Sequence, residues 1–276
     1  MSSSYGGIVC FLLTTAAYYM FLKPKPTMEK PTTVSAANLA IYFLLVLLGQ
    51  FGVNASTLVS KCGGSLSENM TAAFTLTLFP WLLLFGAVIA ILQAYPGFKS
   101  AFADVIGYFY VSSSANTVLT ELLVNKDVQD KLPANISDAE KNQMMEAADT
   151  IIKIAGNTSV LINQMVPSNF AEFWNVLQPL MKSEYQQKGD GMSETTEAKK
   201  KLLFDLVASR DNVGEAMWYI YTGFLIISVV QLQINTRGCT MNPKQMAKNY
   251  QNYLAEQEKT KAATELATST EYTVTG

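Results

Sequence analysis

Long apolar runs alternate with polar segments along this chain. Three runs lie in the first hundred residues and a fourth is centred near residue 225. A helix that crosses the ~30 Å hydrocarbon core of a bilayer needs about 20 apolar residues. Only helices and closed barrels satisfy their own backbone there. The pattern therefore predicts four transmembrane helices, over residues 5–22, 36–53, 71–95 and 216–234.

Local signals mark the ends of these helices. A Lys-Pro-Lys-Pro run at 23–26 ends the first, since proline cannot continue a helix. Ser35 is placed to cap the second, Pro80 should kink the third, and aromatic residues begin the fourth, as in interfacial belts. The first run has no basic residues before it and no small-x-small cleavage site after it. This favours a retained anchor over a signal peptide.

The segment 96–120 is aromatic and nearly uncharged, and it predicts an interfacial or re-entrant helix. Pro96-Gly97 indicates a sharp exit from the third span, and if Gly97 adopts a positive φ a branched side chain there would be strained. Gly86, inside that span, is expected at a close contact between helices. Beyond the exit, apolar residues recur at helical spacing: Phe98, Ala101, Phe102, Val105, Ile106, Phe109 and Tyr110. We expect this face to lie in lipid or against the spans.

A fifth span over 103–120 is the alternative. Four spans place both termini on one side of the membrane and residues 96–215 on the other. The basic residues at 23–30 and at 237–248 then lie on opposite sides, in conflict with the positive-inside rule. A fifth span would remove the conflict, but it would have to carry Asp104 near one end and the polar run from Ser112 to Asn116. A carboxylate in the middle of a span costs roughly 2.5–3.5 kcal/mol, and less near the headgroups. We therefore predict four spans.

Residues 121–211 have an ordinary soluble composition and predict a small helical domain. Capping boxes open helices at Ser137 and Asn169, and a third helix is expected from Thr195 to Ser209. A fourth box, Asn212 to Glu215, should begin the last span. The second helix carries an apolar stripe that we interpret as a possible partner contact: Phe170, Phe173, Trp174 and Leu177.

The tail after the fourth span predicts one more helix. Asn242 is placed as its cap, with Pro243 at the first helical position. A narrow apolar stripe over two turns forms a second possible partner contact: Met246, Tyr250, Tyr253 and Leu254. Beyond Lys261 the composition favours disorder.

The chain thus divides into five parts. These are a three-helix transmembrane region (1–95), an interfacial helix (96–120), a soluble helical domain (121–211), the last transmembrane helix (212–236) and the tail (237–276). The fold class is all-α and polytopic.

Composition and charge argue against several functions. The net charge of −2, without a basic patch, does not favour nucleic-acid binding. The sequence contains no histidine, the commonest general base and zinc ligand. Its three cysteines, Cys10, Cys62 and Cys239, are too scattered for a metal motif, and at least one must stay unpaired within the chain. Nucleotide-binding and metalloprotease motifs are missing from the sequence. We expect a non-enzymatic protein without cofactor or metal.

Two polar residues, Gln50 and Asn54, lie at the end of the second span. We interpret them as satisfied packing residues. The alternative function is a small channel or transporter-like protein of a cellular membrane, in which these side chains would serve the transported ion.

The order of parts resembles a family of internal-membrane proteins in virions of large icosahedral DNA viruses of algae and protists. The residues that carry the resemblance are Tyr95, Pro96, Gly97, Phe98, Phe102, Gly107, Tyr108, Cys239, Asn242, Pro243 and Met246. It covers residues from about 35 to 255, and Asp104 stands where the family pattern implies Asn. The resemblance implies a minor capsid protein in the virion's internal membrane. Its partners would be the lipid bilayer, capsid or other virion membrane proteins, and further copies of itself in an oligomer.

Overall fold

A computed structural model of the chain describes residues 2–31, 35–123, 157–182, 184–186, 193–239 and 243–269. The helix expected after Ser137 lies outside these residues. In the described part every regular element is helical, and the only strand-like contact is an isolated bridge between Leu123 and Met181. The predicted all-α class is confirmed.

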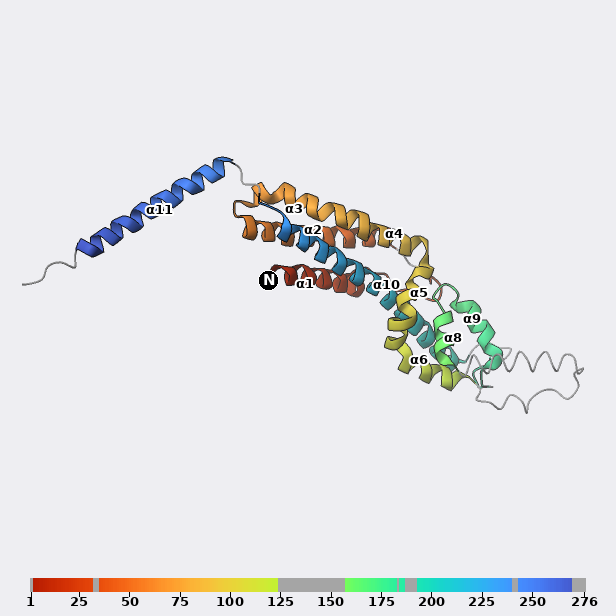
Figure 1. Cartoon of the computed structure of the whole chain (residues 1–276). Helices are drawn as coiled ribbons and strands as arrows, with labels where there is room; N and C mark the ends of the chain where they lie inside the picture. The colour runs from red at the N-terminus through yellow and green to blue at the C-terminus, as the bar shows by residue number, and fades with distance from the viewer. Residues whose placement is uncertain are drawn as a thin grey trace, which may run out of the picture.

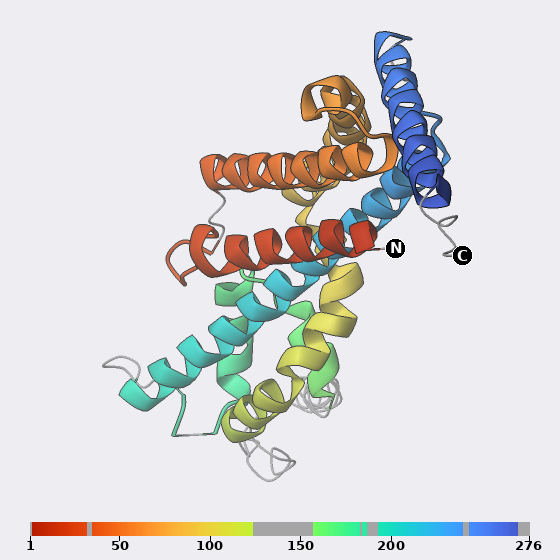
Figure 2. The same ribbon diagram turned by 90° about the vertical axis from the view of Figure 1, so that its left-hand side faces the viewer.

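Within the described ranges, four helical segments are long and apolar enough to cross a membrane, as predicted. They pack side by side in a bundle (Figures 1 and 2). The first is α1 (Ser2–Ala17) with a π-helical turn, Tyr18–Leu22; the second is α2 (Ala36–Cys62); the third is α3 (Leu66–Pro80), a π-helical turn (Trp81–Phe85) and α4 (Gly86–Ala94); the fourth is within α10 (Glu194–Thr236). The chain is therefore an all-α polytopic membrane protein.

The signals predicted at Leu22, Ser35 and Pro80 hold, but the capping box predicted at Asn169 does not form. The Asn169 side chain makes no cap at the helix that begins at Phe170, and its Oδ1 accepts from the Val166 N–H instead. The first helical segment ends at Leu22, directly before Lys23. The Ser35 side chain accepts a hydrogen bond from the Asn38 backbone N–H at the start of α2. Pro80 is followed by the π-helical turn, because a proline removes one backbone donor and the hydrogen-bond pattern shifts around it. Local chemistry thus sets the end of the first span, the start of the second and the irregular turn inside the third.

Helix α10 differs from the prediction, because it runs for 43 residues without a break. Its cap is Ser193, whose side chain accepts from the Thr196 N–H. The expected helix from Thr195 and the last span are one element, and no helix starts at Asn212. Its first half lies in the helical domain and its second half in the bundle (Figure 1).

The exit from the third span is a chain of short helical pieces. Pro96–Lys99 is a 3-10 turn, followed by α5 (Ser100–Phe102), a π-helical turn (Ala103–Gly107) and α6 (Tyr108–Leu122). In Figure 1 the chain turns across the end of the bundle after α4, and α6 then packs on the first half of α10.

Two hydrophobic cores lie at the two ends of α10. The domain core combines α6, α8 (Thr158–Gln164), α9 (Phe170–Leu177) and the first half of α10. The bundle core is rich in aromatic side chains from all four spans, among them Phe11, Tyr42, Trp81, Phe85 and Tyr219. Helix α10 is the element common to both cores.

The tail forms α11 (Pro243–Ser269), which projects away from the bundle (Figures 1 and 2). The helix continues beyond Lys261, where disorder was expected, because alanine and glutamate favour helix. Asn242 and the side chain of Met246 lie outside the described residues. Tyr250 and Tyr253 are exposed on this helix.

Candidate functional site at the junction of bundle and domain

A buried cluster of charged side chains joins the bundle to the helical domain. Glu215, midway along α10, is 2% exposed. Its Oε1 lies 2.5 Å from the Lys23 Nζ and its Oε2 lies 2.8 Å from the Lys99 Nζ. Lys99 also contacts Asp211 at 3.1 Å, and the Tyr19 hydroxyl donates to Glu215. Two cations and two carboxylates thus form a neutral cluster.

The electrostatics of the two lysines differ. Burial lowers the pKa of Lys23 below its ordinary value, although Glu215 acts in the opposite direction. Burial would also lower the pKa of Lys99, but Glu215 and Asp211 together raise it above the ordinary value. Lys99 therefore holds its charge because two carboxylates face it. Its chain position, just after Pro96-Gly97, makes the exit turn part of the cluster.

Arg210 forms a second buried connection, between α10 and α8. Its guanidinium donates to the backbone carbonyls of Ile162 and Met165, the latter at 2.8 Å, and to the Asn163 side chain at 3.2 Å. The Asp104 carboxylate lies 3.7 Å from it. Burial raises the pKa of Asp104, against the effect of Arg210. Arg210 thus ties the exit segment, α8 and α10 together.

Two glycines let the exit segment cross α10 at close range. A Cβ on Gly107 would lie 2.5 Å from the Arg210 carbonyl oxygen. A Cβ on Gly214 would lie 2.8 Å from the Lys99 carbonyl oxygen and 2.7 Å from the Ala103 Cβ. Neither position has room for a side chain, because backbone atoms close the contact from both helices.

A cavity of about 440 Å³ opens beside the cluster. Its wall includes Lys23, Lys99, Asp211 and Glu215 together with the prolines of the two connecting segments. Each charged group of the cluster is already ion-paired. In the described residues no group of three or more His, Cys, Asp or Glu side chains could hold a metal ion. The arrangement is suited to fixing helices in place.

The structure brings part of the predicted exit motif to this junction and leaves the rest exposed. Gly107 is buried, Tyr108 packs against the domain core, and the Phe102 ring lies 5.1 Å from the Trp218 ring. Tyr95, Pro96 and Phe98 are exposed. Gly97 is not at positive φ: the described positive-φ glycines are Gly63 and Gly64, and a Cβ on Gly97 would meet nothing within 4 Å.

The close helix approach expected at Gly86 is also absent, because the only atom near its Cβ position is the Trp81 carbonyl oxygen of the same helical segment, at 4.0 Å. Tight approaches in the bundle occur at Gly49, against the Cys10 Sγ, and at Gly223, against the Phe11 ring. Cys10 is the free cysteine. A glycine's sequence position within a span does not reveal which side faces a neighbour.

The predicted partner stripe on α9 is largely internal. Phe170, Trp174 and Leu177 are buried in the domain core, and only Phe173 is partly exposed. Periodicity correctly identified an apolar face, but α6 and the first half of α10 cover it. A partner would reach Phe173 and the neighbouring Val176, which is exposed, without rearrangement.

The interpretation of Gln50 and Asn54 as packing residues is confirmed. The Gln50 side chain donates to the Gly7 carbonyl at 2.9 Å. The Asn54 side chain donates to the Thr77 hydroxyl at 2.9 Å and accepts from the Gln231 side chain at 3.3 Å. These bonds connect all four spans across the bundle.

We did not predict the charged cluster from the sequence, because we interpreted Glu215 as part of a capping box. A usable signal was present. Lys23 follows the first span, Lys99 follows the third, and Glu215 precedes the fourth. Four spans place these three positions at the same membrane face, so topology alone brings opposite charges together.

Comparisons with protein-family models, with curated proteins and with solved structures found no match. The resemblance to virion internal-membrane proteins therefore stays a prediction.

Proposed function

We propose that this protein is a non-enzymatic structural component of a virion, and that it joins an internal lipid membrane to the surrounding protein shell. Four spans hold it in the bilayer, and the helical domain contacts capsid or other virion membrane proteins. The sequence support is the exit motif around Tyr95-Pro96-Gly97 and the Pro243 tail, in the order that the family resemblance implies.

The observation that carries the proposal is the continuity of α10. A single helix of 43 residues extends from the domain through the junction to the far end of the bundle, where its last turn contacts Lys61 at the end of α2. At its midpoint Glu215 is ion-paired to Lys23 and Lys99, which follow two other spans. A protein that transmits force between a membrane and a shell needs such a stiff connection, since a flexible linker would let the two parts move independently.

The polar side chains of the bundle also fit a structural role. Those that a channel could use, Gln50 and Asn54, bond to neighbouring spans instead. Their removal is expected to loosen the bundle, whereas a channel hypothesis requires that it abolish ion flux in reconstituted liposomes. Flux that is lost on changing Gln50 while the bundle keeps its thermal stability would favour the channel.

Extraction from purified particles tests the membrane part of the proposal. Detergent is expected to release the protein, whereas high salt and alkaline carbonate are not. Release by carbonate alone would contradict integral insertion. A photo-crosslinking residue at Val176, exposed on α9, tests the link to the shell. The matched control is Leu48, exposed on α2. Val176 is expected to capture a shell protein and Leu48 is not; equal capture, or none at Val176, would contradict the link.

A further inference from the structure

The exit segment leaves a large apolar surface uncovered. We call it the aromatic exit face; it consists of Tyr95, Phe98, Val105, Ile106, Phe109 and Tyr110. All six side chains are exposed, Phe109 at 84%. The opposite side of the same segment, including Ala103, Gly107 and Val111, is buried against α10. Near the bundle this segment is therefore apolar on both sides, unlike a surface helix of a soluble domain.

The exposed side changes character along α6. Phe109 and Tyr110 are followed one turn later by Ser113 and Ser114, which are exposed as well. Thr117 and Thr120 continue the polar side. Exposed aromatic side chains thus belong to residues 95–110, and exposed hydroxyl side chains belong to residues 113–120 of α6, which packs on α10. Such a change is expected where a helix passes from the membrane interface into water.

The aromatic exit face is continuous with the outer surface of the fourth span. Phe102 packs on Trp218 and Tyr221, and the Trp218 indole N–H donates to the Phe98 carbonyl at 2.8 Å. Tyr221 is exposed, and the outer side of α10 continues with Phe224 and Leu225 towards the membrane centre. The face therefore adjoins a surface that meets lipid.

We propose that the aromatic exit face lies in the headgroup and upper acyl region of the leaflet on the domain side. This contact would set the height and the tilt of the helical domain relative to the bilayer. This proposal requires only that the protein is integral to a membrane, and it does not depend on the proposed virion function.

Fluorescent labelling at two positions tests this proposal. Phe109→Cys and Ser113→Cys lie one turn apart on the same side of α6, and both wild-type side chains are exposed. Each is made in full-length protein with Cys10→Ala, labelled with NBD and reconstituted in phosphatidylcholine vesicles. The label at 109 is expected to show blue-shifted emission and quenching by nitroxide lipids, and the label at 113 quenching by iodide.

Iodide quenching at 109 as strong as at 113 would overturn the proposal, because the face would then lie in water. Protection of the 109 label from both quenchers would also overturn it, because a second copy or another protein would then cover the face. Tyr110→Cys repeats the measurement at a neighbouring exposed position, and size-exclusion chromatography checks that each labelled protein is folded.

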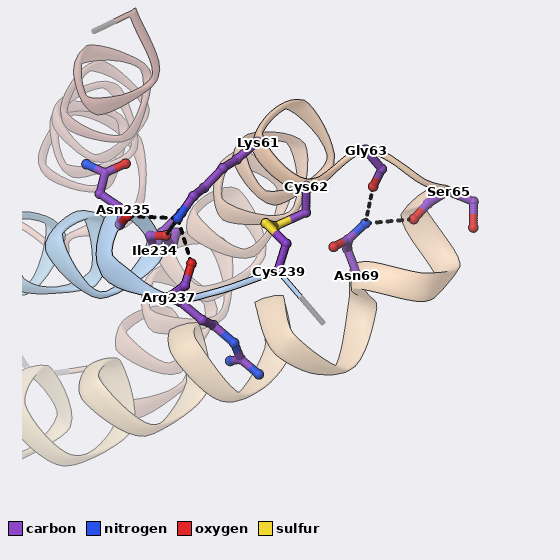
Figure 3. The surroundings of a disulfide bond; sticks show 9 residues. All are labelled: Lys61, Cys62, Gly63, Ser65, Asn69, Ile234, Asn235, Arg237 and Cys239. Carbon is purple, nitrogen blue, oxygen red and sulfur yellow. Dashed lines mark hydrogen bonds between the residues drawn. A yellow bond between two sulfur atoms is a disulfide. The ribbon is translucent and has the colours of Figure 1, made fainter. Parts of the chain in front are cut away.

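A second inference rests on the opposite end of the bundle. There a disulfide joins Cys62, at the end of α2, to Cys239, beyond α10, with Cα atoms 5.4 Å apart (Figure 3). The adjacent Lys61 Nζ donates to the carbonyls of Ile234, Asn235 and Arg237 at 2.6–2.8 Å. The start of the tail is thus fixed to the turn between α2 and α3.

The cysteines are unevenly distributed between the two ends of the bundle. Cys10 lies within the bundle, and the sequence has no cysteine in 23–35 or 95–212. Lysine and arginine occur at both ends, so they do not decide the orientation. Disulfides persist in oxidising compartments and are rare where thiols are kept reduced. We infer that the Cys62–Cys239 end faces an oxidising compartment and that the helical domain faces the reducing, cytosolic side.

This orientation also identifies which proteins each surface can meet. The helical domain is accessible to proteins that assemble in the cytosol, and α11 faces the other compartment. The orientation does not depend on the proposed virion function, because a cellular membrane protein would obey the same redox rule.

Thiol counting and cysteine labelling test the orientation. The unreduced, denatured protein is expected to have one free thiol and the reduced protein three. Three free thiols without reductant would overturn the inference. Glu194→Cys and Gln251→Cys, both at exposed positions in a Cys10→Ala background, are then labelled in cells whose plasma membrane alone is permeabilised. A membrane-impermeant maleimide is expected to label 194 directly and 251 only after detergent. The reverse order, or labelling of both without detergent, would overturn it.

Discussion

The two halves of α10 belong to one helix but differ on their exposed sides. In both halves most buried side chains are apolar, such as Phe204 in the domain half and Ile226 in the bundle half. The exposed side chains of the domain half include the charged Lys201 and Asp205, whereas the large exposed side chains of the bundle half are apolar, such as Leu225, Val229 and Leu232. The exposed side chains of a helix, rather than its buried ones, therefore indicate whether it lies in water or in lipid.

The polarity of the exposed side chains of α10 changes near Glu215, at the level of the charged cluster. Lys23, Lys99 and Asp211 surround that carboxylate at the level where the exposed side chains turn from polar to apolar. Burying an ion pair costs the free energy of removing both charges from water. Their mutual attraction offsets most of this cost only if both partners are present. Placed between water and lipid, the cluster fixes which residues of α10 lie in each.

Removal of the central carboxylate should give the largest effect. Glu215→Leu leaves Lys23 and Lys99 buried near each other without their common partner, and breaking a buried pair in this way costs roughly 3–5 kcal/mol. We expect a large drop in the thermal unfolding midpoint in lipid nanodiscs. Asp205→Leu, an exposed position on the same helix, is the control and should change it little. Equal stability of the two variants would show that the cluster does not hold the junction.

A charge placed on the exposed side should affect the two halves of α10 differently. Leu225 and Leu202 are exposed to similar extents, 50% and 44%. Leu225→Lys puts an ammonium group near the middle of a span, at a cost of roughly 2.5–3.5 kcal/mol. Leu202→Lys should be tolerated within about 0.5 kcal/mol, as at an ordinary surface site. Carbonate extraction and thermal unfolding measure both, and equal tolerance would mean that the bundle half is not in lipid.

The crossing of the exit segment over α10 gives a smaller but specific effect. Gly107→Ala places a methyl group 2.5 Å from the Arg210 carbonyl, where backbone must move, and overpacking of this kind costs about 1–3 kcal/mol. Gly97→Ala, ten residues earlier, meets open space and should be neutral. The thermal unfolding midpoints of the two variants show whether the exit segment depends on close packing at Gly107 or on the turn at Gly97. A destabilised Gly97 variant beside a stable Gly107 variant would reverse our assignment.

Much of the fold could be predicted because membrane helices obey strong local rules. The four spans follow from apolar length, and the ends at Lys23 and Ser35 follow from proline and capping chemistry. The interpretation of Gln50 and Asn54 was correct because polar side chains in a span need partners. These features depend on residues near one another in sequence or on the solvent alone.

The features that could not be predicted depend on distant residues. Asn212 to Glu215 matches a capping box locally, but Glu215 pairs with residues 192 and 116 positions earlier, counted from Lys23 and Lys99. The stripe at Phe170 and Trp174 indicated an apolar face without indicating what covers it. Three cysteines allow several pairings, and only the bundle brings Cys62 to Cys239.

A cysteine scan along the exposed side of α10 tests directly whether its two halves lie in different solvents. Residues 202, 205, 225, 229 and 232 are changed to cysteine one at a time, in a Cys10→Ala background with the Cys62–Cys239 disulfide intact. Their reaction rates with a water-soluble maleimide are then measured in vesicles that have been permeabilised, so that the reagent reaches both faces of the membrane. We expect fast reaction at 202 and 205 and strong protection at 225, 229 and 232. Similar rates at all positions would contradict this expectation, because α10 would then lie in one solvent throughout.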